Sequence, residues 1–175
     1  MYNVQFGPME WINGPADDPH DLCAHGCVSV TMGEKVLVYD CCASAAAMRM
    51  LRTLTEDHEI EDVWAGQQML PCCGHEMFAD GENVTICGCP NGVDYAVRHE
   101  GDAVCLITED GERYTVPFAE YLAGTMPFLD ALESFYQSAS PKMFYDDMEK
   151  TGFDAFWKEW NRRRNSLKIF LETRK

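Results

Sequence analysis

Cysteine and histidine residues gather in three short stretches of the chain. These stretches are Cys23-Ala24-His25-Gly26-Cys27, Pro71-Cys72-Cys73-Gly74-His75 and Cys87-Gly88-Cys89-Pro90. All nine cysteines lie between Cys23 and Cys105, and the last seventy residues have none. Cysteine beside histidine binds metal, performs thiol chemistry or fills a core, and each use implies a different protein.

A structural zinc site is the first of these alternatives. Such sites use four Cys or His ligands, often as two pairs close in sequence. Residues two apart on a strand face the same side, and a hairpin joining residues 72–79 to residues 83–89 would bring two such pairs together. The predicted ligands are Cys73, His75, Cys87 and Cys89, and zinc is the one cofactor that the sequence indicates.

Two features argue against zinc and favour cysteine as a small buried hydrophobe. The chain has no Cys-x-x-Cys knuckle. It also has two vicinal pairs, Cys41-Cys42 and Cys72-Cys73, whose neighbouring side chains would diverge on a strand.

Thiol catalysis is the second alternative, and it requires a histidine base near the nucleophile. Cys73 lies two residues from His75, and Cys27 lies near His25 and Asp21. The signatures of papain-type and caspase-type enzymes are absent, as is a Cys-x-x-Cys redox pair. Inert cysteines are the competing interpretation.

Carboxylates in the run Asp17-Asp18-Pro19-His20-Asp21 offer ligands for Ca²⁺ or Mg²⁺. No EF-hand pattern is present, and aspartates beside proline are typical of turns, where they cap backbone amides. The turn interpretation is favoured. Nucleotide binding is excluded because the chain has neither Gly-x-Gly-x-x-Gly nor a Walker A sequence.

The formal net charge of −15 is unevenly distributed. Residues 1–157 hold 7 Lys/Arg and 27 Asp/Glu, a net of −20, whereas residues 158–175 hold 7 Lys/Arg and 2 Asp/Glu, a net of +5. Such an acidic body repels phosphate backbones, so no nucleic-acid partner is predicted. A basic protein is the predicted partner, although solubility alone also explains an acidic surface.

Neither a membrane span nor a signal peptide is predicted. No apolar stretch approaches the roughly 20 residues that a span requires, and the N-terminus lacks a basic segment followed by an apolar one. We therefore expect a cytoplasmic protein with reduced thiols. The odd number of cysteines agrees, because nine cannot all pair within one chain.

Aromatic and basic residues meet near the C-terminus. Phe153, Phe156, Trp157 and Trp160 share one face of a predicted helix, just before Arg162-Arg163-Arg164. Core packing is the favoured interpretation of the aromatic residues. The arginines are interpreted as the solvated face of a terminal helix or as a segment that clamps onto the acidic body by ion pairs. If that face is exposed, the predicted partner-binding residues are Trp157, Trp160, Arg162 and Arg163.

Strands and tight turns dominate the first part of the chain. Tyr2–Phe6 is a predicted edge strand, and residues 27–31 and 35–39 form a predicted hairpin. A helix is predicted over 45–54, with Ser44 as its N-cap. Turn signals near every tenth residue then predict an antiparallel meander of strands at 76–79, 83–87, 93–99, 103–108 and 112–116.

The last third is predicted to be helical. An apolar stripe runs from Phe118 to Tyr136, and Pro127 within it predicts a kink or two abutting helices. Thr151-Gly152-Phe153-Asp154 has the pattern of a capping box. The predicted fold is one α+β domain over 1–175, strand-rich in 1–116 and helical in 117–175. Its antiparallel sheet (hairpin plus meander) has one inserted helix, and the C-terminal helices pack on one face.

Three functions follow from these patterns. The leading prediction is a non-enzymatic domain that binds another macromolecule, for example an immunity-type antagonist of a basic nuclease toxin. An acidic surface would speed the capture of such a target. The alternatives are a zinc-stabilised Cys/His domain and a thiol enzyme that uses Cys73 or Cys27.

Overall fold

The N-terminal sheet has three antiparallel strands in the order β1-β2-β3. The computed structural model describes residues 1–60, 67–74 and 76–173. β1 (Tyr2–Phe6) is an edge strand, and β2 (His25–Met32) and β3 (Lys35–Cys42) form a hairpin. The hairpin turns at Gly33, whose φ of +60° is a conformation that glycine adopts without strain. The predicted edge strand and hairpin are confirmed.

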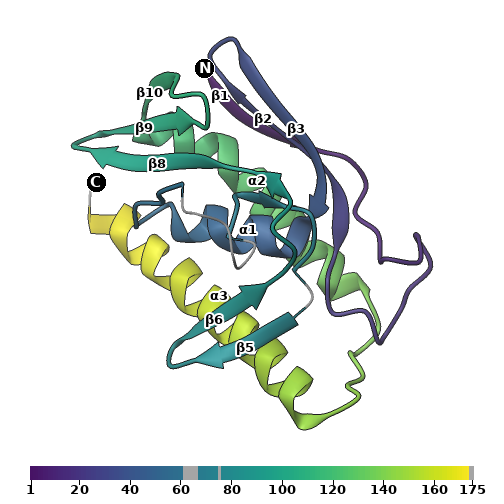
Figure 1. The fold of residues 1–175 in the computed structure, drawn as a ribbon. Coiled ribbons are helices and arrows are strands. Elements are labelled where there is room, and N and C mark those ends of the chain that lie inside the picture. The colour runs from purple at the N-terminus through teal and green to yellow at the C-terminus, as the bar shows by residue number, and fades with distance from the viewer. Residues whose placement is uncertain (61–66, 75, 174–175) are drawn as a thin grey trace.

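Helix α1 (Ala43–Arg52) follows β3 directly and is buried from Ala43 to Leu51. Alanine side chains let other elements approach it closely, and in the view of Figure 1 it lies between the β8-β9 strands and α3. Ser44 is not the predicted N-cap, since it lies inside the helix and Cys42 occupies the cap position. The Ser44 hydroxyl instead accepts the Ala24 N–H (N···O 2.8 Å), because a tertiary partner competes with the local cap.

The predicted series of strands is present but divided among three units. β5 (Glu76–Asp80) and β6 (Asn83–Cys87) form a hairpin of their own. β8 (Tyr95–Glu100), β9 (Ala103–Thr108) and β10 (Arg113–Pro117) form the meander. Between them, the two-residue strand β7 (Gly92–Val93) pairs with β4 (Leu70–Pro71), which precedes β5 in the chain.

Two long helices complete the α+β fold and pack on strands (Figure 1). α2 (Phe118–Ser138) contacts β1, and Pro127 lies within it without ending it. α3 (Asp147–Thr173) contacts β5 and β6. A Cβ on Gly152 would lie 1.9 Å from the Met77 carbonyl oxygen, so this glycine lets α3 lie directly on β5. Within the described residues, no helix is both long and apolar enough to cross a bilayer.

The N-terminus of α3 corrects the predicted capping box. The helix begins at Asp147, so Thr151 lies inside it and donates its hydroxyl to the Asp147 carbonyl (2.6 Å). Asp146 provides the cap instead, because its Oδ1 accepts the N–H groups of Met148 and Glu149, each at 2.9 Å. The sequence signal for this helix start is Asp146, followed three residues later by Glu149.

A buried carboxylate joins α3 to α1 and to β6. Glu159 has no exposed surface, and its carboxylate accepts bonds from Arg52 on α1 (2.8 Å) and from Arg163 one turn along α3 (2.7 Å). It also accepts the Val84 N–H at 2.7 Å. These bonds compensate the cost of burying the charge.

Candidate metal centre

Three cysteines meet where two loops lie against each other. Cys72 and Cys73 directly follow β4, and Cys89 lies between β6 and β7. The Cys72 N–H donates to the Asn91 carbonyl (N···O 2.9 Å) and ties the loops together. A Cβ on Gly88 would lie 2.2 Å from the Cys73 carbonyl oxygen, so this close approach requires glycine.

The sulfur atoms of Cys72, Cys73 and Cys89 all lie within 4.8 Å of one another, and we call them the thiol cluster. Zn–S bonds of about 2.3 Å in a tetrahedral site separate the sulfur ligands by roughly 3.8 Å, which is within this range. The three side chains are half-buried. Thiolates select soft or borderline cations over Mg²⁺ and Ca²⁺, so the cluster offers three ligands of the kind that zinc prefers.

The three thiols differ in acidity. The backbone N–H of Asn91, followed by hydrogen bonds with Cys73 and Cys72, lowers the pKa of Cys89. A hydrogen bond with Cys89 raises the pKa of Cys72, and burial raises the pKa of Cys73. The Cys73 sulfur also accepts the Cys89 N–H (N···S 3.0 Å). Negative charge therefore resides first on Cys89, and a bound cation would allow the other two to ionise.

The predicted zinc ligands overlap this cluster only in part. Cys73 and Cys89 belong to it, and Cys72 joins them. Cys87 is the last residue of β6, and the group found among the described residues does not include it. His75 lies outside the described residues, so its role stays a prediction.

Strand alternation explains why sequence reasoning missed Cys72. Adjacent side chains diverge on a strand, but β4 ends at Pro71, and both cysteines of the vicinal pair lie in the loop beyond it. There the backbone is free to direct both sulfur atoms to one side. The available signal was the proline immediately before the pair, because proline is confined to particular positions of strands.

Most of the remaining cysteines contribute to packing. Cys23 and Cys42 are buried at the start of α1, where the Cys23 thiol donates to the Gly74 carbonyl (S···O 3.2 Å). The interaction with the Cys23 side chain lowers the pKa of the Cys42 thiol. This pair holds the loop that carries Cys73 against α1. Two further cysteines are buried as small hydrophobes, namely Cys41 and Cys105.

The acidic loop has the geometry of capped turns. Each of its aspartates accepts at least one backbone N–H. The pairs are Asp17 with Ser140 (2.9 Å), Asp18 with His20 (3.0 Å), and Asp21 with Cys23 (2.9 Å) and Ile12 (2.6 Å). The bonds of Asp18 and Asp21 to the N–H groups two residues ahead agree with the turn interpretation, whereas Asp17 joins the loop to Ser140 from a distant part of the chain.

The two candidate nucleophiles occupy different surroundings. Cys27 is exposed on β2, whereas Cys73 is half-buried in the thiol cluster. The Asp21 carboxylate, which lies near His25 and Cys27 in the sequence, accepts bonds from two backbone amides. Burial keeps the pKa of Cys73 above its ordinary value, which opposes the thiolate that catalysis requires.

The predicted partner-binding residues are divided between the core and the surface. Trp160 is fully buried and donates its indole N–H to Glu133 (2.6 Å). Arg163 is 7% exposed and enclosed by ion pairs. Trp157 and Arg162 are half-buried and retain surface that a partner could contact. Partner binding itself stays a prediction.

Comparisons of the chain with models of protein families, with curated proteins and with solved structures found no match.

Proposed function

We propose that this protein binds Zn²⁺ through Cys72, Cys73 and Cys89, and that the ion stabilises the fold. The proposal rests on the convergence of three sulfur atoms, from two separate loops, within 4.8 Å of one another. Three thiolates this close would repel one another, so a divalent cation is the partner that would allow all three to ionise. His75, two residues beyond Cys73, is the predicted fourth ligand.

A structural role is favoured by the weakness of the local strand pairing. β4 and β7 are joined over two residues only, Leu70 with Val93 and Pro71 with Gly92. An ion held by Cys72 and Cys73 on one side and Cys89 on the other would cross-link the same two segments. Because the site exists only in the folded chain, the free energy of binding contributes to folding.

Substitution of single ligands tests this proposal. It also distinguishes the thiol cluster from the ligand set predicted from the sequence, which contains Cys87 in place of Cys72. We expect Cys72→Ser to lower zinc affinity by at least about tenfold, since it removes a ligand. Cys87→Ser, a matched change on β6, should keep the parent affinity. The measurement is a competition titration of the apoprotein with Zn²⁺ and a chromophoric chelator, followed by thermal melting. Parent-like binding by Cys72→Ser would refute the cluster, and His75→Ala would test the fourth ligand.

We also propose, on a separate observation, that the acidic body binds a basic protein. Two of the C-terminal arginines are paired within the molecule, since Arg163 pairs with Glu56 and Arg164 with Asp130. These ion pairs neutralise two cations of the basic segment, while the chain keeps a net charge of −15. A pulldown at low and at moderate salt should recover a basic protein, more at low salt. Recovery of none at either salt concentration would contradict this proposal.

A further inference from the structure

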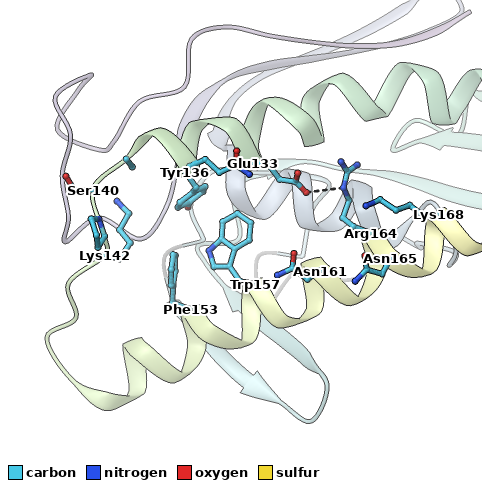
Figure 2. A pocket seen from close by; sticks show the side chains of 13 residues that line it. Glu133, Tyr136, Ser140, Lys142, Phe153, Trp157, Asn161, Arg164, Asn165 and Lys168 are labelled. Carbon is cyan, nitrogen blue, oxygen red and sulfur yellow. Dashed lines mark ion pairs between the residues drawn. The ribbon is translucent and has the colours of Figure 1, made fainter.

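A groove of about 520 Å³ lies between the C-terminal part of α2 and one face of α3. Small-molecule sites typically have volumes of about 300–1,000 Å³. Figure 2 shows that α3 lines it with a continuous stripe of side chains. The stripe consists of residues three or four positions apart, which share one helix face, namely Phe153, Trp157, Asn161, Arg164, Asn165 and Lys168.

One end of the groove is aromatic. The Trp157 ring lies edge to face with Tyr136 of α2 (centroids 5.1 Å apart) and with Phe153 (6.3 Å). All three side chains are half-buried, so part of this aromatic wall remains open to the groove. Such a wall suits a flat apolar ring, because offset and edge-to-face aromatic contacts are favourable.

The other end is polar and then cationic. Asn161 and Asn165 are exposed on the same face of α3 and offer both donors and acceptors. One turn further, Lys168 is exposed, and in Figure 2 its side chain reaches back from α3 towards Arg164. Within the described part of the chain, Lys168 has no carboxylate partner.

The charge of the groove is opposite to that of the molecule. Its lining contains the cations Lys142, Arg164 and Lys168 and one carboxylate, Glu133, although the chain has a net charge of −15. Arg164 is paired with Glu133 (3.0 Å), and the Lys142 ammonium lies 3.2 Å from the centroid of the Trp11 ring. Lys168 is therefore the cation most available to a ligand.

We propose that this groove binds a small molecule in which a flat aromatic ring is joined to an anionic group. The ring packs against Trp157, the anion lies beside Lys168, and the two asparagines between them bond to polar atoms of the ligand. The aromatic contact supplies most of the affinity. Lys168 makes the groove prefer an anionic ligand over an uncharged one. An exposed charge pair contributes little binding free energy, but only the charged ligand gains it.

Binding of 4-(2-naphthyloxy)butanoate, compared with that of the uncharged alcohol 4-(2-naphthyloxy)butan-1-ol, tests this proposal by calorimetric or NMR titration. The ether oxygen and the linker suit the distance between Trp157 and Lys168, which are about 16 Å apart along the axis of α3. We expect the acid to bind about threefold more tightly than the alcohol. Lys168→Gln should remove that difference, and Asn165→Asp should weaken binding of the acid alone. Trp157→Leu should weaken both ligands by roughly tenfold.

The controls lie on the same helix but outside the groove. Lys158→Gln and Ser166→Asp change exposed residues and make the same changes in net charge, so both should bind the naphthyloxy acid like the parent. The two charge variants, at exposed positions, remain decisive even if Trp157→Leu fails to fold. The proposal is overturned if neither naphthalene binds, if the alcohol binds as well as the acid, or if Lys158→Gln loses as much as Lys168→Gln. Cys72→Ser should bind like the parent, so this result is independent of the zinc proposal.

Discussion

At the scale of single residues, the thiols of Cys72, Cys73 and Cys89 compete for the same protons. The pKa values of Cys72 and Cys73 are raised and that of Cys89 is lowered, so the first two carry protons at neutral pH. Zinc binds thiolates, and it must therefore displace these protons. We expect zinc affinity to rise with pH, by about tenfold per pH unit for each proton displaced.

Competition titrations at several pH values between about 6 and 8 would measure this slope. Cys87→Ser should show the parent's slope, because Cys87 is not in the thiol cluster. An affinity that does not change over this range would show that the ion does not bind through protonated thiols.

At the scale of elements, the buried Glu159 decides how α3 is attached. Burial raises its pKa, but the bonds from Arg52, the Val84 N–H and Arg163 outweigh burial, so the net pKa is lowered. A lowered pKa in the folded state means that the carboxylate stabilises the fold above its unfolded pKa, near 4.5. This stabilisation is lost as the pH falls through the lower folded pKa.

We expect Glu159→Gln to lower the free energy of unfolding by about 3 kcal/mol at pH 7, because it leaves the partly buried Arg52 without its anion and the buried Arg163 with Glu56 as its only carboxylate partner among the described residues. The difference from the parent should shrink as the pH falls below about 4.5. Urea unfolding at neutral and acidic pH measures both effects. Asp154→Asn breaks an exposed pair on the same helix and should cost less than about 0.5 kcal/mol. Equal losses in the two variants would argue against the buried network.

At the scale of the whole molecule, we expect the proposed zinc ion to raise the free energy of unfolding, mainly by stabilising the segments that carry the thiol cluster. A ligand present at a thousandfold its Kd stabilises a fold by about 4 kcal/mol. In a chain of this length each kcal/mol is equivalent to about 2–4 °C in Tm. We therefore expect a chelator to lower Tm by about 10 °C.

Hydrogen exchange would show where the stabilisation is lost. Amides of residues 70–73 and 88–93 should lose protection when zinc is removed, because the thiol cluster joins these segments. Those of β8 and β9, which pair over six residues, should keep it. Uniform loss over the whole chain would place the effect of the metal elsewhere.

The thiol cluster and the helix caps could not be fully predicted from neighbouring residues in the sequence. The caps predicted at Ser44 and Thr151 are wrong because their hydroxyls bond to Ala24 and Asp147 instead. Sequence reasoning placed Cys73 and Cys89 in one site. It excluded Cys72, because strand alternation does not hold in the loop that follows β4.

The sequence by itself determined the α+β class, the edge strand, the hairpins and the helical last third. These depend on turn residues and on apolar periodicity, which act over a few neighbouring residues. Only the tertiary structure decided that Cys72 joins Cys89, that Trp160 and Arg163 are enclosed, and that a cationic groove lies on an acidic molecule. Those outcomes depend on how elements far apart in the chain pack together, and no local pattern encodes that arrangement.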